Sequence, residues 1–305
     1  MTIRFDNRVA IVTGAGGGLG RSHALLLASR GAKVVVNDPG GAVDGRGGDS
    51  SAADKVVAEI KAAGGQAVAN YDSVASFKGA QNIIATAMDA FGGVDILVNN
   101  AGILRDKSFA KMPIEDFEFV MQVHFMGSVY CTKAAWPIMM ERKYGRIVLT
   151  TSGAGLNGNF GQSNYGAAKT AMIGFQNCLK HEGAKHNIRI NAISPFANTR
   201  MTGPVSDPEM LKFGRPEVIS PAVAWLCSEA CDVTGEIIGA GSGYYCSIRY
   251  WRSDGEVVDP NANVTVDDFA AIAGKVFDYS DGGHRYQGMT VRAKELLIQR
   301  GYIKG

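Results

Sequence analysis

Between residue 8 and about residue 241, short apolar runs alternate with longer segments in which apolar residues recur every three or four positions. Two of the runs, 9–12 and 147–149, are apolar throughout, which is typical of strands buried on both faces of a sheet. The alternation predicts an α/β fold, with a doubly wound parallel sheet between helices. The runs predicted as strands are 8–13, 33–38, 66–71, 94–99, 145–150, 188–194 and 236–239.

Two long amphipathic segments are predicted as helices. Residues 76–91 form one, and residues 114–142 form another that Pro137 is expected to interrupt. After residue 243 aromatic and charged residues interleave, and a capping box at Thr265 and Asp268 begins a new helix with one apolar stripe. We expect one domain over residues 1–243, and an extension over 244–305 that packs on this domain or on a partner subunit.

The composition narrows the class of partner. The chain of 305 residues is 46% hydrophobic, which is enough to build a large core. Its 31 Lys and Arg against 29 Asp and Glu give a net charge of +2, so no strong field attracts nucleic acid or an anionic membrane. No run of apolar residues is long enough to span a membrane. A small molecule is therefore the expected partner.

Five scattered cysteines, an odd number, argue against a disulfide framework and favour a reducing cytoplasm. Cys227 and Cys231 lie in an apolar stretch and are expected to be buried thiols. The five histidines do not gather around them, so no metal site is expected.

A glycine-rich segment lies between the first predicted strand and the helix that follows it. Glycines at such a junction let the backbone turn sharply and approach a pyrophosphate, whose charge the free N–H groups of the helix N-terminus stabilise. A tight turn without a ligand is the alternative. The residues of this predicted dinucleotide-binding loop are Gly14, Gly16, Gly18, Leu19 and Gly20.

Asp38 ends the second predicted strand, 18 residues after Gly20. A carboxylate at this place can accept hydrogen bonds from the ribose hydroxyls of an adenosine, and it would repel a phosphate on that ribose. No Lys or Arg lies in the glycine-rich segment or directly after Asp38, and Arg46 is the first that could swing in. We therefore expect NAD rather than NADP, with a solvated turn carboxylate as the alternative.

Tyr165 and Lys169 stand four positions apart at the start of a predicted helix, so their side chains share one face. An ammonium beside a phenol favours the phenolate and lowers the pKa of the tyrosine. This pair predicts Tyr165 as a general base, although such pairs are also common on helices without any function.

Together these motifs resemble the short-chain dehydrogenase/reductase family. The matching residues, in the family's order and spacing, are Thr13-Gly14-x-x-x-Gly18-x-Gly20, Asn99-Asn100-Ala101-Gly102, Ser152 and Tyr165-x-x-x-Lys169. The resemblance covers residues 8 to about 243 and implies a seven-stranded Rossmann fold, with residues 1–243 as the NAD-binding and catalytic domain. It implies that Tyr165 transfers the proton, that Ser152 orients the substrate oxygen and that Lys169 also holds the nicotinamide ribose.

The same resemblance implies further contacts to the cofactor. Those residues are Asp72 and Ser73 after the third strand, Asn100, Ala101 and Gly102 after the fourth, and Pro195 and Thr199 after the sixth. His124 stands where the family usually has Asn as a fourth catalytic member, a residue that positions a water through its main chain. His124 could do the same, and a structural histidine at a helix kink is the alternative.

A narrower resemblance involves segments 37–41, 100–109 and 158–165 together with His124. These are similar to the (3R)-hydroxyacyl-CoA dehydrogenase unit of peroxisomal multifunctional β-oxidation enzymes and to bacterial stand-alone relatives described as 17β-hydroxysteroid dehydrogenases. The resemblance implies hydride transfer between a secondary alcohol or ketone and NAD, with a 3-hydroxyacyl-CoA or a steroid as substrate. An NADPH-dependent 3-oxoacyl ketoreductase and a non-catalytic NAD-binding sensor are the alternatives.

The substrate side and the assembly are less constrained by the sequence. Arg105 and Lys107 could meet the phosphates of coenzyme A, or could be solvated loop cations. The family resemblance implies a homodimer, with a tetramer as the alternative. Aromatic residues that could line an apolar pocket for the substrate are Phe109, Phe160, Phe196 and Tyr244.

Overall fold

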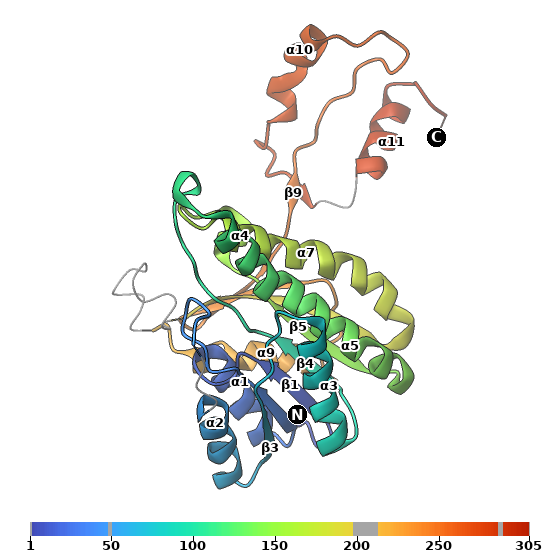
Figure 1. The fold of residues 1–305 in the computed structure, drawn as a ribbon. Coiled ribbons are helices and arrows are strands. Elements are labelled where there is room, and N and C mark those ends of the chain that lie inside the picture. The colour runs from blue at the N-terminus through green and yellow to red at the C-terminus, as the bar shows by residue number, and fades with distance from the viewer. Residues whose placement is uncertain (1, 48–50, 198–212, 286–288, 305) are drawn as a thin grey trace. The chain divides into compact units, whose positions relative to one another are not determined.

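The computed structural model describes residues 2–47, 51–197, 213–285 and 289–304 (Figure 1). The chain divides into two compact units, Met1–Ser247 and Ile248–Gly305, each of which is described by itself.

The first unit is built on one sheet, which has eight strands within the described residues. Their order in space is β3-β2-β1-β4-β5-β6-β7-β8, and neighbours from β3 through β7 are parallel. This confirms the predicted doubly wound α/β fold. The strands are β1 (Val9–Thr13), β2 (Lys33–Asn37), β3 (Gln66–Asn70), β4 (Ile96–Asn99), β5 (Gly145–Thr150), β6 (Ile188–Phe196), β7 (Ile237–Gly241) and β8 (Tyr244–Ile248).

The eighth strand is one more than the sequence predicted. Ser242 and Gly243 join β7 to β8, and both have positive φ angles, of 51° and 81°. Two such residues are typical of the tight turn that joins the strands of an antiparallel hairpin, and β8 is the neighbour of β7 in the sheet. The segment that begins at Tyr244 therefore starts as part of the sheet.

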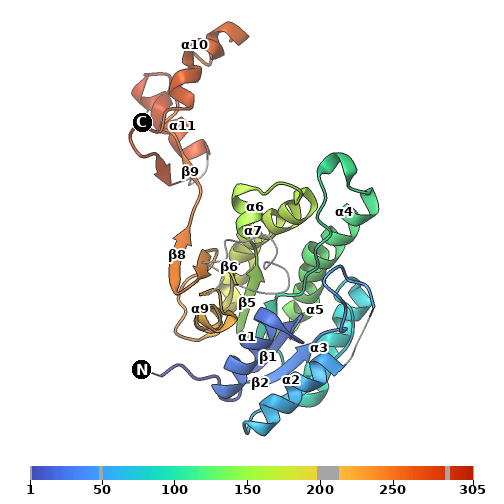
Figure 2. The same ribbon diagram turned by 90° about the vertical axis from the view of Figure 1, so that its left-hand side faces the viewer.

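Helices cover both faces of this sheet (Figures 1 and 2). One layer contains α1 (Gly18–Ser29), α2 (Ser51–Ala62) and α9 (Ser220–Cys227), in which α2 and α9 both pack against α1 through a cluster of buried aliphatic side chains. The other layer contains α3 (Phe77–Phe91), α4 (Ile114–Met121), α5 (Gly127–Arg142) and α7 (Ser163–Gly183), with the short α6 (Gly153–Asn157) against α7. Cys131, Cys227 and Cys231 are buried, and all five cysteines are free.

The long predicted helix over residues 114–142 is irregular at a different place from the one expected. α5 runs through Pro137 without a break, whereas a π-helical turn at Gln122–Met126 separates it from α4. A π turn inserts one extra residue per turn and is frequent at functional sites. His124 lies at the centre of this turn.

The second unit contains a two-stranded sheet and two helices. β9 (Trp251–Arg252) pairs antiparallel with β10 (His284–Arg285), and the helices are α10 (Val266–Val276) and α11 (Met289–Gln299). Thr265 and Asp268 form the predicted capping box at the start of α10. None of the residues of α10 is buried, so the packing of this segment on the domain or on a partner stays a prediction.

Helices long and apolar enough to cross a membrane are absent from the part of the chain that the structure describes.

Candidate active site

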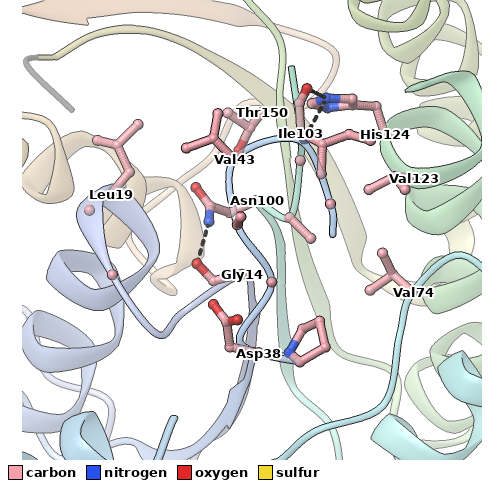
Figure 3. Close-up of a pocket in the computed structure, with 18 of the residues that line it drawn as sticks. Gly14, Leu19, Asp38, Val43, Val74, Asn100, Ile103, Val123, His124 and Thr150 are labelled. Atoms are coloured by element: carbon pink, nitrogen blue, oxygen red, sulfur yellow. Dashed lines mark hydrogen bonds between the residues drawn. The ribbon is translucent and has the colours of Figure 1, made fainter. Parts of the chain in front are cut away.

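A cavity of about 440 Å³ lies at the carboxyl ends of the parallel strands (Figure 3). The strand order reverses between β1 and β4, and ligands of doubly wound sheets bind at such a switch point. Gly14 follows β1, Asp38 follows β2, Asn100 follows β4 and Ser152 follows β5, and all four line the cavity. The sheet topology therefore gathers residues that are far apart in sequence.

The glycine-rich loop is held tightly against the segment after β4. Gly14 has a φ of +64°, and a Cβ there would come within 2.8 Å of Ala101 Cα, so only glycine fits. The Asn100 amide donates a hydrogen bond to Gly14 O at 3.1 Å (Figure 3) and another to Thr13 O at 2.9 Å. The Thr13 hydroxyl accepts hydrogen bonds from the backbone N–H groups of Asn100 and Ala101, both at 3.1 Å.

Asp38 supports the same loop from β2. Its Oδ2 accepts a hydrogen bond from the Gly16 N–H at 2.8 Å, and its Oδ1 accepts one from the Gly40 N–H at 2.7 Å. Gly17 caps α1 without any side-chain hydrogen bond, so no side chain of the cap competes for the N–H groups at the start of this helix. These N–H groups and the dipole of α1 form a site suited to a pyrophosphate.

Most of the residues implied by the family resemblance line the cavity, but not all of them. Gly16 and Gly20 instead pack closely, Gly16 against the Asp38 carboxylate and Gly20 against Gly14 O, and Thr199 lies outside the described residues. Asp72 does not line the cavity, and its carboxylate accepts hydrogen bonds from Asn70 and Asn82. Those that line it are Gly14, Gly18, Leu19, Asp38, Ser73, Asn100, Ala101, Gly102, His124, Ser152, Tyr165, Lys169 and Pro195.

A loop over residues 39–47 also lines the cavity, which the sequence reasoning did not anticipate. The Leu104 N–H donates a hydrogen bond to Val43 O at 2.9 Å, and the Arg105 side chain donates one to Asp44 O at 3.0 Å. The number of glycines after Asp38 was the available signal. Arg46 in this loop pairs with Asp44, is 79% exposed in its side chain and does not line the cavity.

The three residues predicted to be catalytic line one end of the cavity, which we call the chemical end. They are Ser152, Tyr165 and Lys169. Ser152 caps α6, and its Oγ accepts a hydrogen bond from the Ala154 N–H at 3.2 Å. Tyr165 and Lys169 both project from α7, and the Lys169 Nζ lies 5.5 Å from the centre of the Tyr165 ring. Lys169 is buried and its Nζ donates a hydrogen bond to Thr150 O at 2.5 Å.

The pKa of Tyr165 shifts opposite to the direction predicted from its lysine neighbour. Burial of the phenol raises the pKa, the Ser152 hydroxyl acts in the lowering direction, and the nearby Asp106 carboxylate raises it further. Burial also lowers the pKa of Lys169 to about 7. Burial, rather than the charge of the neighbouring group, is the largest influence on the pKa of both Tyr165 and Lys169.

His124 is 1% exposed and contacts both the segment after β4 and the Tyr165 ring. Its Nε2 is 2.7 Å from Ile103 O and 3.0 Å from Ile103 N (Figure 3). Its ring meets the Tyr165 ring edge to face, with 5.1 Å between the ring centres. Burial first, and then the charge of Lys169, lower the pKa of His124 well below its ordinary value, so the ring is neutral near pH 7.

Three polar atoms of residues that line the cavity have no partner among the described residues. Asn37 Oδ1, Thr150 Oγ1 and His124 Nδ1 are all buried and make no hydrogen bond. Buried polar atoms are normally satisfied, so these three are expected to bond to a ligand or to water. The glycine-rich loop, the start of α1 and these atoms together fit a dinucleotide.

The residues suggested for the substrate side do not behave as expected. Phe109, Phe160 and Tyr244 are exposed, Phe160 by 90%, and none of them lines the cavity. The apolar wall is formed instead by other side chains, including Ile103, Phe119 and Val123. Arg105 and Lys107 both form ion pairs with Asp116, at 3.0 and 3.3 Å.

Comparison with known proteins identifies the first unit further. A protein-family model described as short chain dehydrogenase matches residues 8–209. A short-chain type dehydrogenase/reductase from Mycobacterium tuberculosis is 51% identical over 275 residues, which are 90% of this chain and 96% of that protein.

Two solved structures are similar as well. Full-length peroxisomal multifunctional enzyme type 2 from Drosophila melanogaster has a TM-score of 0.80 at 40% identity, and the match covers 97% of this chain. This chain spans about half of that enzyme, since the match covers 50% of its length. A 7α-hydroxysteroid dehydrogenase in complex with NADH and 7-oxo glycochenodeoxycholic acid has a TM-score of 0.71 at 32% identity, covering 79% of this chain and 95% of that one.

Proposed function

The chain belongs to the short-chain dehydrogenase family, and we propose that it transfers hydride between a secondary alcohol or ketone and NAD, with a 3-hydroxyacyl-CoA as substrate. The observation that carries this proposal is the single cavity that joins the glycine-rich loop and Asp38 to Ser152, Tyr165 and Lys169.

The preference for NAD over NADP rests on charge. Asp38 lines the cavity at the end of β2, where its carboxylate can accept hydrogen bonds from ribose hydroxyls and repels a ribose phosphate. Among the described residues that line the cavity, Lys169 is the only Lys or Arg, and it lies at the opposite, chemical end. Arg46 is paired with Asp44 rather than placed beside Asp38.

The roles proposed for the cofactor-binding residues follow from their positions. The start of α1 would hold the pyrophosphate, Ser73 and Val74 would flank the adenine, and Lys169 would hold the nicotinamide ribose. NAD bound in this way supplies the acceptor for the hydride that leaves the carbinol carbon.

The chain's own residues then handle the proton. Tyr165 in its phenolate form takes the hydroxyl proton during oxidation, and its phenol returns a proton to the oxygen during reduction. Ser152 donates a hydrogen bond to the same oxygen. The positive form of Lys169 stabilises the phenolate, and the raised pKa of Tyr165 makes the phenol the dominant form at neutral pH.

The substrate class rests on two points. The segments 37–41, 100–109 and 158–165 resemble the (3R)-hydroxyacyl-CoA dehydrogenase unit, and the similar Drosophila enzyme is a peroxisomal multifunctional enzyme. The wall formed by Ile103, Phe119 and Val123 suits an apolar acyl chain. A bulky sterol is the second candidate, since a hydroxysteroid dehydrogenase shares the fold at 32% identity.

Formation of NADH with (3R)-hydroxyacyl-CoA esters of increasing length, and separately with 17β-hydroxysteroids, tests this proposal. Each substrate is assayed with NAD and with NADP. We expect turnover of the CoA esters with NAD. Tight binding of NADPH would contradict the cofactor assignment and favour a 3-oxoacyl ketoreductase, whereas turnover of steroids alone would contradict the substrate class.

A non-catalytic NAD-binding sensor is the remaining alternative. Undiminished turnover by Tyr165→Phe would contradict the proposed role of Tyr165, while silence of the wild-type protein on all substrates, with NAD still bound, would favour the sensor. The cytoplasmic location stays a prediction, which cell fractionation tests. The homodimer, with a tetramer as the alternative, also stays a prediction, which light scattering tests.

A further inference from the structure

A second cavity, of about 510 Å³, lies where the parallel strands begin, at the edge of the sheet opposite the active-site cavity. Arg8 precedes β1, Arg146 is the second residue of β5 and Arg189 is the second residue of β6. We call this cavity the basic cleft, after the charged residues that line it: Arg8, Arg142, Lys143, Arg146, Arg189 and Glu229.

Carboxylates balance only part of the charge in the basic cleft. The buried Asp95 pairs with Arg8 at 3.2 Å and with Arg142 at 3.4 Å, and Glu229 also pairs with Arg8. Lys143, Arg146 and Arg189 have no carboxylate partner within the described ranges. Five cations against two carboxylates leave an excess of three positive charges.

Arg146 is held in one orientation. Its side chain is buried, its Nε donates to Ser228 O at 3.1 Å, and its Nη1 donates to Gly145 O at 2.8 Å and to Asn187 O at 2.9 Å. The guanidinium lies over the Tyr144 ring at 4.4 Å. Because these bonds involve Nε and Nη1, the Nη2 group has no hydrogen-bond partner in the portion of the chain that is described.

Arg189 lies beside Arg146 in the register of β5 and β6, and its Nη1 is buried without a hydrogen-bond partner among the described residues. A buried, unpaired donor of a charged group is costly, and two neighbouring guanidinium groups repel each other. Burial and, among the neighbouring charges, Arg189 lower the pKa of Arg146 below its ordinary value. An anion in the basic cleft would satisfy both unpaired groups.

We propose that the basic cleft binds a phosphate-bearing anion, with Arg146 and Arg189 contacting phosphoryl oxygens and Lys143 adding charge at the exposed side. Guanidinium groups match the geometry of phosphate oxygens, and a fixed pair of them can grip two phosphoryl groups at once. The cavity volume of about 510 Å³ is large enough for a diphosphate. This site is independent of the proposed dehydrogenase activity.

Titration calorimetry of the full chain with inorganic pyrophosphate tests this site. The titrations are made with saturating NAD, so that the glycine-rich loop does not compete. We expect Arg189→Gln to weaken binding at least tenfold, and Lys143→Asn to weaken it several-fold, since Asn tolerates the left-handed backbone of Lys143. Lys55→Gln, on the exposed side of α2, is the matched control and is expected to bind as the wild type does.

Two results would overturn the proposal. One is the absence of binding by the wild-type chain at millimolar pyrophosphate, and the other is equal affinity of the wild type and Arg189→Gln, which would place the anion elsewhere. A parallel titration with ADP separates a free diphosphate from one carried on a nucleoside. In the titrations with pyrophosphate and with ADP alike, the proposal requires the same loss of affinity in Arg189→Gln. An unchanged thermal unfolding midpoint shows that this variant is folded.

Discussion

Gly102 leaves space for the ring of His124. A Cβ built on Gly102 would come within 2.7 Å of His124 Nδ1, so the two residues cannot both keep their places if Gly102 gains a side chain. His124 is the middle residue of the π-helical turn, and its ring meets the Tyr165 ring edge to face. The position of Tyr165, the proposed proton carrier, therefore depends on the absence of a side chain at Gly102.

We expect Gly102→Ala to destabilise the chain by about 1–3 kcal/mol, because overpacking a buried site forces neighbours to move. Urea unfolding measures this loss. His124→Asn replaces the imidazole ring by a smaller amide, so the double variant is expected to recover about 1 kcal/mol relative to the sum of the single variants. Strictly additive single and double variants would contradict a direct contact.

Oxidation of the alcohol by the wild-type chain is expected to accelerate as the pH rises above neutrality. The pKa of Tyr165 is raised, and the phenolate is the form that accepts the proton. Reduction of the ketone uses the phenol and is expected to slow over the same rise in pH. Rate profiles in both directions with one alcohol and ketone pair measure this, and parallel profiles would contradict the role of Tyr165.

Tyr165→Phe is expected to lower the rate of oxidation by about 10²–10⁴-fold, which is the usual contribution of a general acid or base. The ring and its contact with His124 remain, so NAD binding is expected to stay within a factor of about two to three, measured by fluorescence quenching. Tyr130→Phe, a tyrosine on α5 that lies outside the cavity lining, serves as the control.

Asp106→Asn is expected to shift the pH profile of oxidation toward lower pH. The Asp106 carboxylate raises the pKa of Tyr165, so its replacement by a neutral amide lowers that pKa and makes the phenolate available earlier. Asp106 also accepts a hydrogen bond from Gln162 at 2.6 Å, which the amide oxygen of Asn can keep. A profile that moves toward higher pH would contradict this electrostatic coupling.

His23 is expected to make the fold sensitive to acid. Burial lowers its pKa from 6.5 to about 3, and its Nδ1 is 2.7 Å from Ser220 Oγ. Below pH 6.5, His23 binds a proton in the unfolded chain but stays neutral in the folded chain. The contribution of His23 to stability is therefore present above pH 6.5 and is lost as the pH falls toward 3. The loss approaches about 1.4 kcal/mol per pH unit.

Unfolding midpoints in urea at pH 7 and pH 4.5 compare the wild type with His23→Gln, which cannot titrate. We expect a smaller drop in the free energy of unfolding for His23→Gln over this interval. Equal drops in the two proteins would show that other groups cause the acid sensitivity.

Seven strands of the large sheet and several helices followed from local features of the sequence. β5 begins and ends where the apolar run 145–150 predicted, and α3 begins after the Ser76 cap at the expected place. These elements are specified by periodicity and by caps within a few residues. The grouping of the motif residues that follow the strands was predictable for another reason. Parallel strands of such a sheet end at the same edge, so the residues directly after them lie close together.

Other features depend on contacts between distant segments and were missed. The π turn places His124 against Gly102 and the backbone of Ile103, and no pattern within 114–142 reveals these contacts. The pKa of Tyr165 is set by burial among several elements rather than by Lys169 alone. The loop 39–47 closes over the cavity through its bonds to Leu104 and Arg105.

The hydroxyl of Thr13 accepts two backbone hydrogen bonds across the switch point, and the Asn100 amide returns two. These four bonds join the ends of β1 and β4 into one seam, from which both the glycine-rich loop and the segment touching His124 extend. The dinucleotide half and the chemical half are thus not separable modules. We expect a substitution that shifts the loop to shift the segment beside His124 as well, so the two halves must be altered together when such a site is redesigned.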